Sequence, residues 1–315
     1  MDGPTYVLLA SNAYSGSTLL SFLLGAHPRI ATVSDVSGAR RQHRMDAFRC
    51  SCGRLMAEDP FWLEVRDRMR AAGWPDFDLA NFRLGFDYAD SAAFNRLRVG
   101  TLRWGWLESA RDTAFRAWPG DQARMRTIGL RTAAFARVVA GMSAASVFVD
   151  ASKERLRATN LARHLPLELR VIHLVRDVRA VAASARRHPS SASDTVADAA
   201  RRWARTNEAI SRSLRALPAS RRTLVRYEDL CRNPAEELAR LYRFCGVDPE
   251  AAPPLERAPT QHLLGNRVRL ERLVDIRLDE RWRNELTRAE QEEARHVAAA
   301  TQATLYPDDH HSSNE

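Results

Sequence analysis

Residues 11–18 read SNAYSGST and lie between two apolar stretches, YVLLA at 6–10 and LLSFLL at 19–24. An apolar strand, a turn of small residues and the start of a helix make up a phosphate-binding loop. The nucleoside triphosphatase form of this loop, GxxxxGK[ST], requires a glycine at position 11 and a lysine at position 17, and this chain has serine at both. The sequence therefore predicts a loop that holds an anion without the lysine that grips a nucleotide's terminal phosphates.

Length and composition are those of an ordinary globular protein. The 315 residues, 45% hydrophobic and 28% charged, suffice for one large α/β domain or two small ones. No apolar run approaches the roughly 18–20 residues of a membrane span, and the start MDGPTYVLLA lacks the features of a signal peptide. Four cysteines in so long a chain do not indicate a disulfide framework. We expect a cytoplasmic protein of bacterial type.

The basic charge rests almost entirely on arginine. The formal net charge is +9, and the 48 basic residues comprise 47 arginines and one lysine, Lys153. The arginines are scattered along the chain, which favours compositional bias over a nucleic-acid-binding patch. A single lysine that persists against this bias suggests a task that a guanidinium cannot perform, although chance survival remains the alternative.

Apolar runs and helical patterns alternate along much of the chain. The pattern predicts strands at 5–11, 146–152, 169–177 and 222–230, and helices at 17–26, 155–164, 178–188 and 233–247. Strands that alternate with helices indicate an α/β fold with a central parallel sheet flanked by helices in three layers, as in the P-loop nucleoside triphosphatases.

A mostly helical insertion is expected over about residues 38–140, where the alternation breaks. We predict one domain over 1–305, with the insertion capping the carboxyl ends of the strands, and a disordered tail at 306–315. The insertion is rich in aromatic residues: Trp74, Phe77, Phe86, Tyr88, Trp104 and Trp106. They could stack on an acceptor molecule, but a role in the insertion's own core is the favoured interpretation.

Three separate places could bind anionic groups. In the loop at 14–19, free backbone N–H groups and hydroxyls could hold a phosphate. Arg176 follows a predicted strand and Ser184 lies two helical turns later, so the pair could hold a second phosphate, unless Arg176 merely pairs with Asp177. Lys153 follows another strand in DASK, and its compact ammonium suits an oxygen that gains charge as a bond breaks, unless it is a surface lysine.

These segments, in this order, resemble the sulfotransferases that use 3′-phosphoadenosine 5′-phosphosulfate (PAPS). The similar segments are YSGSTLLSFLLGAHP (14–28), VFVDASK (147–153), VIHLVRDVRAVAAS (171–184), LVRYEDLCRNPAEELARLYRFCGV (224–247) and HLLGNRVRL (262–270). With the insertion excepted, the resemblance runs from about residue 5 to 270. FRCSCG at 48–53 is similar to a bacterial branch of this family.

The resemblance implies a role for each matching residue. Lys153 would stabilise the leaving 5′-phosphate, Arg176 and Ser184 would hold the 3′-phosphate, and Tyr227, or less strongly Trp203, would pack near the adenine. Two groups would surround the donor: Ser15, Gly16, Ser17, Thr18 and Leu19 around the 5′-phosphosulfate, and Asn266 and Arg267 over the nucleotide. PAPS would be the sulfonate donor, and no metal would be required.

A general base must accept the proton of the attacking hydroxyl. Asp35 lies where the family commonly has a glutamate and is the predicted base, although it is one methylene shorter and could instead be a structural carboxylate. His43 and His262 are the alternatives. Cys50 and Cys52, with His43 nearby, could form part of a zinc site, but a fourth ligand is not evident, so two free thiols are the prediction.

The sequence thus predicts a PAPS-dependent sulfotransferase that acts on a hydroxyl of a small molecule, a carbohydrate, a glycolipid, a natural product or a tyrosine. The expected partner is this small-molecule or carbohydrate acceptor, and neither nucleic-acid binding nor a membrane span is expected. The alternatives are a P-loop kinase, which the missing lysine disfavours, and a basic nucleic-acid-binding protein, which only the net charge supports. The acceptor and the oligomeric state stay open.

Overall fold

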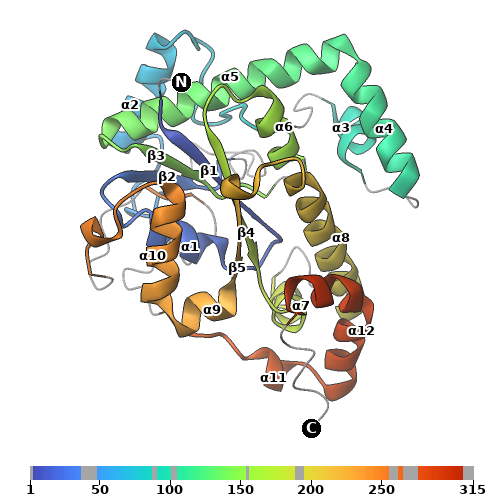
Figure 1. Cartoon of the computed structure of the whole chain (residues 1–315). Helices are drawn as coiled ribbons and strands as arrows, with labels where there is room; N and C mark the ends of the chain where they lie inside the picture. Colours follow the sequence, from blue (N-terminus) through green and yellow to red (C-terminus); the bar gives the residue numbers. More distant parts are fainter. Residues whose placement is uncertain are drawn as a thin grey trace.

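A parallel sheet of five strands forms the centre of the computed structural model (Figure 1). The strands are β1 (Thr5–Ser11), β2 (Ile30–Ser34), β3 (Val147–Asp150), β4 (Leu169–Val175) and β5 (Arg222–Arg226), in the spatial order β2-β3-β1-β4-β5. The structure describes residues 3–36, 48–86, 91–100, 105–153, 156–188, 195–254, 262–264 and 276–307. The predicted α/β fold with a parallel sheet is confirmed.

Both faces of the sheet are buried, as the near-continuous apolar sequence of β1 requires. Tyr6 and Leu8 pack into one hydrophobic cluster, and Val7 and Leu9 pack into the cluster on the opposite face. All four side chains are at most 1% exposed. This alternation identifies β1 as the central strand from which the loop at 12–16 emerges.

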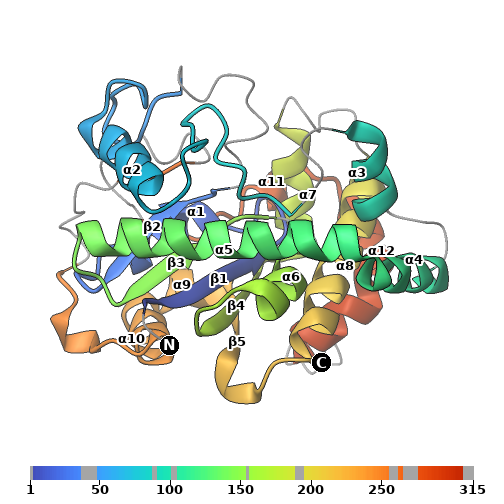
Figure 2. The same cartoon turned by 90° about the horizontal axis from the view of Figure 1, so that it is seen from above.

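Helices cover the two faces in separate layers (Figures 1 and 2). On one face lie α1 (Ser17–Leu24) and α10 (Pro234–Cys245), with α9 (Tyr227–Arg232) beside them. The other face carries α5 (Pro119–Met142), α6 (Arg157–His164) and α8 (Val196–Leu214). Beside α8, α7 (Val178–Arg186) and α12 (Arg288–Leu305) form a third hydrophobic cluster, with α11 (Trp282–Glu285) at its end.

The segment between β2 and β3 contains α2 (Pro60–Ala71), α3 (Ala92–Val99), α4 (Gly105–Ala117) and α5. The long helix α5 packs directly on β2 and β3, so it belongs to the helical layer of the sheet (Figure 2). Phe77 and Phe86 are buried in the core, and Trp74 packs against it. Tyr88, Trp104 and the side chain of Trp106 lie outside the described parts of the chain.

Several sequence predictions change in the structure. The strand predicted at 222–230 ends at Arg226, and Tyr227 begins α9, whose first turn carries Glu228 and Asp229, favourable charges at a helix N-terminus. Strand β2 and helices α8 and α12 were not predicted. Tyr306, the first residue of the predicted tail, is 5% exposed, its hydroxyl donates to Glu228 over 2.9 Å, and its ring belongs to the cluster of α7, α8 and α12.

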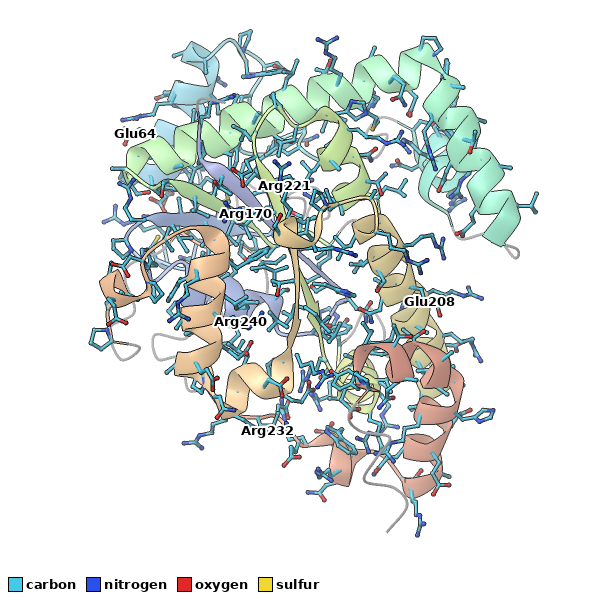
Figure 3. All side chains as sticks on the ribbon, in the orientation of Figure 1. Glu64, Arg170, Glu208, Arg221, Arg232 and Arg240 are labelled. Atoms are coloured by element: carbon cyan, nitrogen blue, oxygen red, sulfur yellow. The ribbon has the colours of Figure 1, made fainter. Side chains whose placement is uncertain are left out.

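Charged side chains lie on the outer surfaces of separate helices, such as Glu64 on α2, Glu208 on α8 and Arg232 on α9 (Figure 3). Several of them form local ion pairs, for example Glu64 with Arg68 over 2.6 Å. Among the described residues, none of the helices combines the length and the apolarity that crossing a bilayer would require.

A buried ion pair joins β1, β3 and α6. The Asp150 carboxylate, at the end of β3, accepts hydrogen bonds from the Tyr6 hydroxyl (2.6 Å) and from the Arg157 guanidinium. Arg157 also donates to the Leu84 carbonyl over 3.0 Å. Tyr6, Asp150 and Arg157 are all 0% exposed, and burial together with the Asp150 charge raises the pKa of Tyr6 well above its usual value. The network fixes the end of β3, from which the chain continues to Lys153.

Replacing Asp150 by asparagine should strongly destabilise the fold. The change keeps the shape but removes the negative charge that pairs with Arg157 at a site that solvent does not reach, which costs about 3–5 kcal/mol of unfolding free energy. Urea unfolding measures this loss. Glu64→Gln, which breaks the exposed pair with Arg68, is the matched control and should cost less than about 1 kcal/mol. Equal losses for the two variants would contradict the role of the buried pair.

Candidate active site at the carboxyl edge of the sheet

All five strands end at the same edge of the sheet, and a predicted site residue or loop follows each strand there. Because all pairings are parallel, the carboxyl ends must lie side by side. In spatial order the strands lead into Asp35 (β2), Lys153 (β3), the loop 12–16 (β1), Arg176 (β4) and Tyr227 (β5). The helix after β1 covers one face, whereas α8, the second helix after β4, covers the other. Such a divergence between neighbouring strands is where α/β proteins bind ligands.

The loop after β1 leaves the start of α1 open to an anion. Gly16 caps the helix with a φ of 87°, and no side chain caps the first turn. The N–H groups of that turn have no partners within the helix, and the helix dipole adds positive potential there. The Ser15 hydroxyl is buried and has no hydrogen-bond partner among the described residues. An orphaned buried hydroxyl beside an uncapped helix start is what a bound phosphate would satisfy.

Gly16 also makes room for an aromatic ring. A Cβ atom at this position would lie 2.5 Å from a ring carbon of Tyr227, so a larger residue would clash as well as strain the left-handed backbone. The Tyr227 hydroxyl donates to the carbonyl of Arg277 over 3.2 Å, and burial raises its pKa. The ring of Tyr227 therefore lies directly on the loop predicted to hold the 5′ end of a nucleotide.

Arg176 connects this loop to the next strand. Its guanidinium donates to the carbonyl of Tyr14 over 3.1 Å and lies 4.5 Å from the centre of the Tyr227 ring. The Nε atom is buried and has no hydrogen-bond partner in the described parts of the chain. The carbonyl of Arg176 accepts a hydrogen bond from Trp203, which is fully buried, so Trp203 supports the end of β4 from beneath.

The Asp279 carboxylate pairs with the Arg176 guanidinium at the site predicted to hold a 3′-phosphate. Asp279 Oδ2 lies 3.1 Å from Arg176 and 3.7 Å from Arg187, and Arg281 binds the same carboxylate over 2.8 Å. Arg281, and after it Arg176, hold the pKa of Asp279 well below its usual range. Arg187 also donates to the Ser184 hydroxyl over 2.9 Å. Arg176 and Arg187 thus face one carboxylate, and Ser184 lies against Arg187.

Lys153 and Asp35 face each other at the ends of β3 and β2. The ammonium lies 3.8 Å from Asp35 Oδ2, a loose ion pair whose side chains are 22% and 16% exposed. The pair is partly accessible to solvent, so a ligand could reach both charges. The predicted charge-stabilising residue and the predicted base therefore do lie together.

The structure brings most of the sequence-predicted site residues to one edge. Asn266, Arg267 and the alternative base His43 lie outside the described residues. Arg187 and Asp279 were missed by sequence reasoning. Arg187 is one of two arginines at the end of α7, a signal too common in this arginine-rich chain to select it, and nothing in the sequence marks Asp279.

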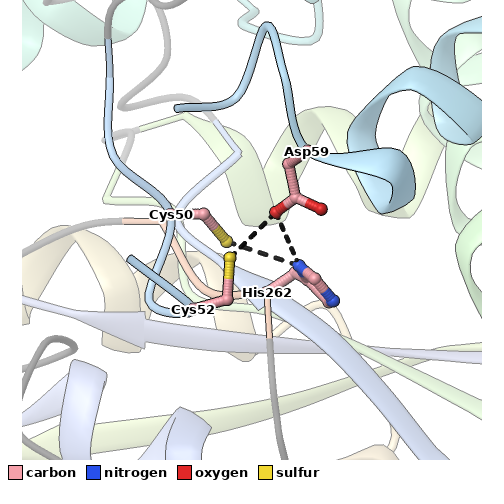
Figure 4. A group of neighbouring side chains, drawn as sticks. All are labelled: Cys50, Cys52, Asp59 and His262. Atoms are coloured by element: carbon pink, nitrogen blue, oxygen red, sulfur yellow. Dashed lines mark hydrogen bonds and ion pairs between the residues drawn. The ribbon is translucent and has the colours of Figure 1, made fainter. Parts of the chain in front are cut away.

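A second group of reactive side chains lies beside the outer strand β2 (Figure 4). The cluster consists of Cys50, Cys52, Asp59 and His262. His262 Nδ1 lies 3.5 Å from Cys50 Sγ and 2.9 Å from Asp59 Oδ2. His262, the other alternative base, is thus engaged by two partners. Burial and the Asp59 carboxylate raise the pKa of Cys52 to about 12.

A cavity of about 420 Å³ lies against the same outer strand. Its lining includes Pro28, Ile30, Phe61, Val139 and Pro253. None of the residues predicted to hold the donor lines this cavity, so we do not place the donor there.

Comparison of this chain with known proteins gave three results. A comparison with curated protein sequences gave no significant match. Among solved structures, the chain is similar to the sulfotransferase domain of the Synechococcus PCC 7002 olefin synthase (20% identity, 95% of this chain and 94% of that chain, TM-score 0.48). It is also similar to the sulfotransferase domain of the curacin biosynthetic pathway (16%, 96% and 98%, 0.49) and to sulfotransferase STF9 from Mycobacterium avium (15%, 97% and 78%, 0.47).

The sequence comparison is more specific. The model of the sulfotransferase family matches residues 13–251, from the loop after β1 to the residues that follow α10. This range covers the ends of all five strands. The protein therefore belongs to the sulfotransferase family.

Proposed function

We propose that this sulfotransferase moves the sulfonate group of PAPS to a hydroxyl acceptor and releases 3′-phosphoadenosine 5′-phosphate (PAP). One observation carries the proposal: two anion-binding features lie on neighbouring strands and are joined by the hydrogen bond from Arg176 to Tyr14. A nucleotide with phosphates on both its 5′ and 3′ positions would fill both. A nucleoside triphosphate carries its phosphates at one end and would leave the Arg176 site empty.

The 5′-phosphosulfate would lie on the loop and the first turn of α1. The backbone N–H groups of residues 17–19 and the hydroxyls of Ser15, Ser17 and Thr18 are the donors at this end. Arg176, with Ser184 and Arg187, would hold the 3′-phosphate. Tyr227, already over Gly16, would lie between the two ends, against the adenosine. Asn266 and Arg267 are proposed to close over the nucleotide.

Lys153 and Asp35 supply the charges that the transfer needs. The acceptor oxygen attacks sulfur in line, the S–O bond to the 5′-phosphate breaks, and the leaving phosphate gains negative charge. The Lys153 ammonium stabilises that charge, which typically contributes a factor of about 10²–10³ in rate. Asp35 accepts the proton of the hydroxyl as the new O–S bond forms. Binding of the donor would separate the loose pair, because Lys153 would then contact phosphate oxygens.

This chemistry needs no metal, because a lysine and an uncapped helix start neutralise the charge that develops on the phosphate. The acceptor is proposed to be a small molecule or a carbohydrate with a free hydroxyl. Mass spectrometry of acceptor candidates incubated with PAPS, read as the gain of one sulfonate, would identify it.

PAP should stabilise the protein against heat, whereas Mg-ATP at the same concentration should not. Saturation at 100 times the dissociation constant adds about 2.7 kcal/mol to the unfolding free energy. Differential scanning fluorimetry measures the shift in Tm. A shift with Mg-ATP and none with PAP would support the kinase alternative and overturn the proposal.

Lys153→Ala should lower kcat by about 10²–10³ and leave the affinity for PAP within a few-fold of the original, because the lysine acts on charge that forms in the transition state. Initial rates with PAPS and isothermal titration with PAP separate the two effects. Lys153→Arg, which keeps the charge but not the compact ammonium, should retain more activity than the alanine variant and still fall well below the original protein. A kcat unchanged in Lys153→Ala would remove the assigned role.

Arg176 and Asp279 should act on PAP binding in opposite directions. Arg176→Ala should weaken PAP binding by about 10–100-fold, the worth of a charge-assisted hydrogen bond, while adenosine 5′-phosphate, which lacks the 3′-phosphate, should lose much less affinity. Asp279→Asn removes the carboxylate that competes for Arg176 and should strengthen PAP binding.

Titration of both nucleotides against each variant tests this pair of effects. Arg240→Ala, which removes an arginine of α10 that pairs with Glu237, is the control and should change neither affinity. Equal losses for PAP and adenosine 5′-phosphate in Arg176→Ala would place the 3′-phosphate elsewhere.

A further inference from the structure

The cluster at Cys50, Cys52, Asp59 and His262 takes no part in the proposed transfer. Its ligand atoms, two sulfurs, one carboxylate oxygen and one ring nitrogen, all lie within 4.8 Å of one another. Three of the residues come from the segment 48–59, and His262 comes from a segment more than 200 residues later. Tertiary folding has therefore brought together four atoms that can bind a metal ion (Figure 4).

The distances are close to those of a tetrahedral site. With the usual bond lengths to zinc, sulfur and nitrogen ligands lie about 3.5 Å apart, and nitrogen and oxygen ligands about 3.3 Å apart. Cys50 Sγ and His262 Nδ1 are separated by 3.5 Å. Asp59 lies 2.9 Å from His262 and 3.0 Å from Cys52, because these groups are hydrogen-bonded. Since no two ligand atoms are more than 4.8 Å apart, shifts of up to about an ångström would bring all four to tetrahedral spacing.

The two cysteines are presented by a tight hairpin. Arg49 and Leu55 pair as an antiparallel bridge, and the Cys50 N–H donates to the Arg54 carbonyl over 2.9 Å. Gly53 closes the turn with a φ of 90°, and its N–H donates to the carbonyl of Cys50 over 2.9 Å. The side chain of Cys50 is buried, so its thiol is held in place by the hairpin.

Further contacts orient the ligand atoms. Trp62 Nε1 donates to Cys50 Sγ over 3.4 Å, and the Phe61 N–H donates to the second oxygen of Asp59 over 3.0 Å. The ring of Phe61 stacks on His262 with 4.1 Å between centres. Such supporting interactions are typical of metal sites, where they fix the orientation of each ligand.

We propose that this cluster binds one Zn²⁺ ion in a structural site. Two soft thiolates, an imidazole and a carboxylate in tetrahedral arrangement favour zinc over the harder divalent ions, which prefer oxygen ligands. Both thiols lose their protons to solvent on binding, and four protein ligands leave no position for a reacting water. In this proposal Cys50 and Cys52, predicted from the sequence to be free thiols, are zinc ligands. The histidine ligand is His262, whereas the sequence suggested His43.

The ion would fasten the late segment of the chain to the sheet. Leu264 pairs with Ser34 at the end of β2, and its N–H donates to Val33 over 2.8 Å. Asp35 follows Ser34 directly. Zinc bound at His262 would therefore hold the segment that borders the proposed base. The site stands independently of the donor, because no residue of the cluster contacts the loop or Arg176 in the interactions described above.

Cobalt binding tests the proposal on the full-length protein. After treatment with a chelator and a reductant, titration with Co²⁺ should produce one equivalent of the absorption bands of tetrahedral cobalt with thiolate ligands, and Zn²⁺ should bleach them stoichiometrically. Cys52→Ser and Asp59→Asn should each weaken zinc binding by at least about 100-fold, while asparagine can still cap α2. Cys231→Ser, at a half-buried cysteine outside the cluster, should bind as the original protein does.

The cobalt bands measure metal binding directly and do not depend on sulfonate transfer. The test of the metal site is therefore independent of the test of the donor site. Bands that persist unchanged in Cys52→Ser would overturn the proposal. So would a protein that takes up no cobalt at stoichiometric concentration, or one in which Cys50 and Cys52 are found joined as a disulfide after purification.

Discussion

The position of the candidate active site at the carboxyl edge of the sheet depends on the buried ion pair between Asp150 and Arg157. This pair lies where β1, β3 and α6 meet, and both of its side chains are inaccessible to solvent. A pair of this kind adds little net stability compared with apolar packing, but breaking it is costly, so it specifies one arrangement. That arrangement sets where β3 ends, and Lys153 is three residues further on. The position of the single lysine is therefore a consequence of the buried core.

At the carboxyl edge of the sheet, two cations are each paired with a carboxylate that a phosphate group could replace. Asp35 holds Lys153 loosely, and Asp279 holds Arg176. A doubly phosphorylated nucleotide would replace both carboxylates with phosphate oxygens, so each cation keeps a counter-ion throughout. The two anionic partners lower the cost of keeping cations desolvated before the donor binds. The two carboxylates also compete with the donor for these cations. The affinity for the donor therefore depends on how much more strongly the cations bind its phosphates than the carboxylates.

The sequence predicted the parts that local pattern controls. An apolar run with small residues at its end identified β1, and parallel order then required Lys153, Arg176 and the loop to share one edge. Strand β2 escaped prediction because IATVS (30–34) is only five residues long and includes two polar residues. Tyr227 was assigned to a strand because the β-favouring residues Val225 and Tyr227 lie on both sides of Arg226. Asp279 and the pairing of Cys50 with His262 depend on contacts across 100 residues or more, which no local pattern contains.

The central claim is that one nucleotide spans the loop at Gly16 and the guanidinium of Arg176. A crystal structure with PAP bound tests it most directly. The account predicts the 5′-phosphate on the first turn of α1, the 3′-phosphate on Arg176 with Asp279 displaced, and the Tyr227 ring against the adenosine. A nucleotide bound in the cavity beside β2, with the pair of Arg176 and Asp279 intact, would contradict it.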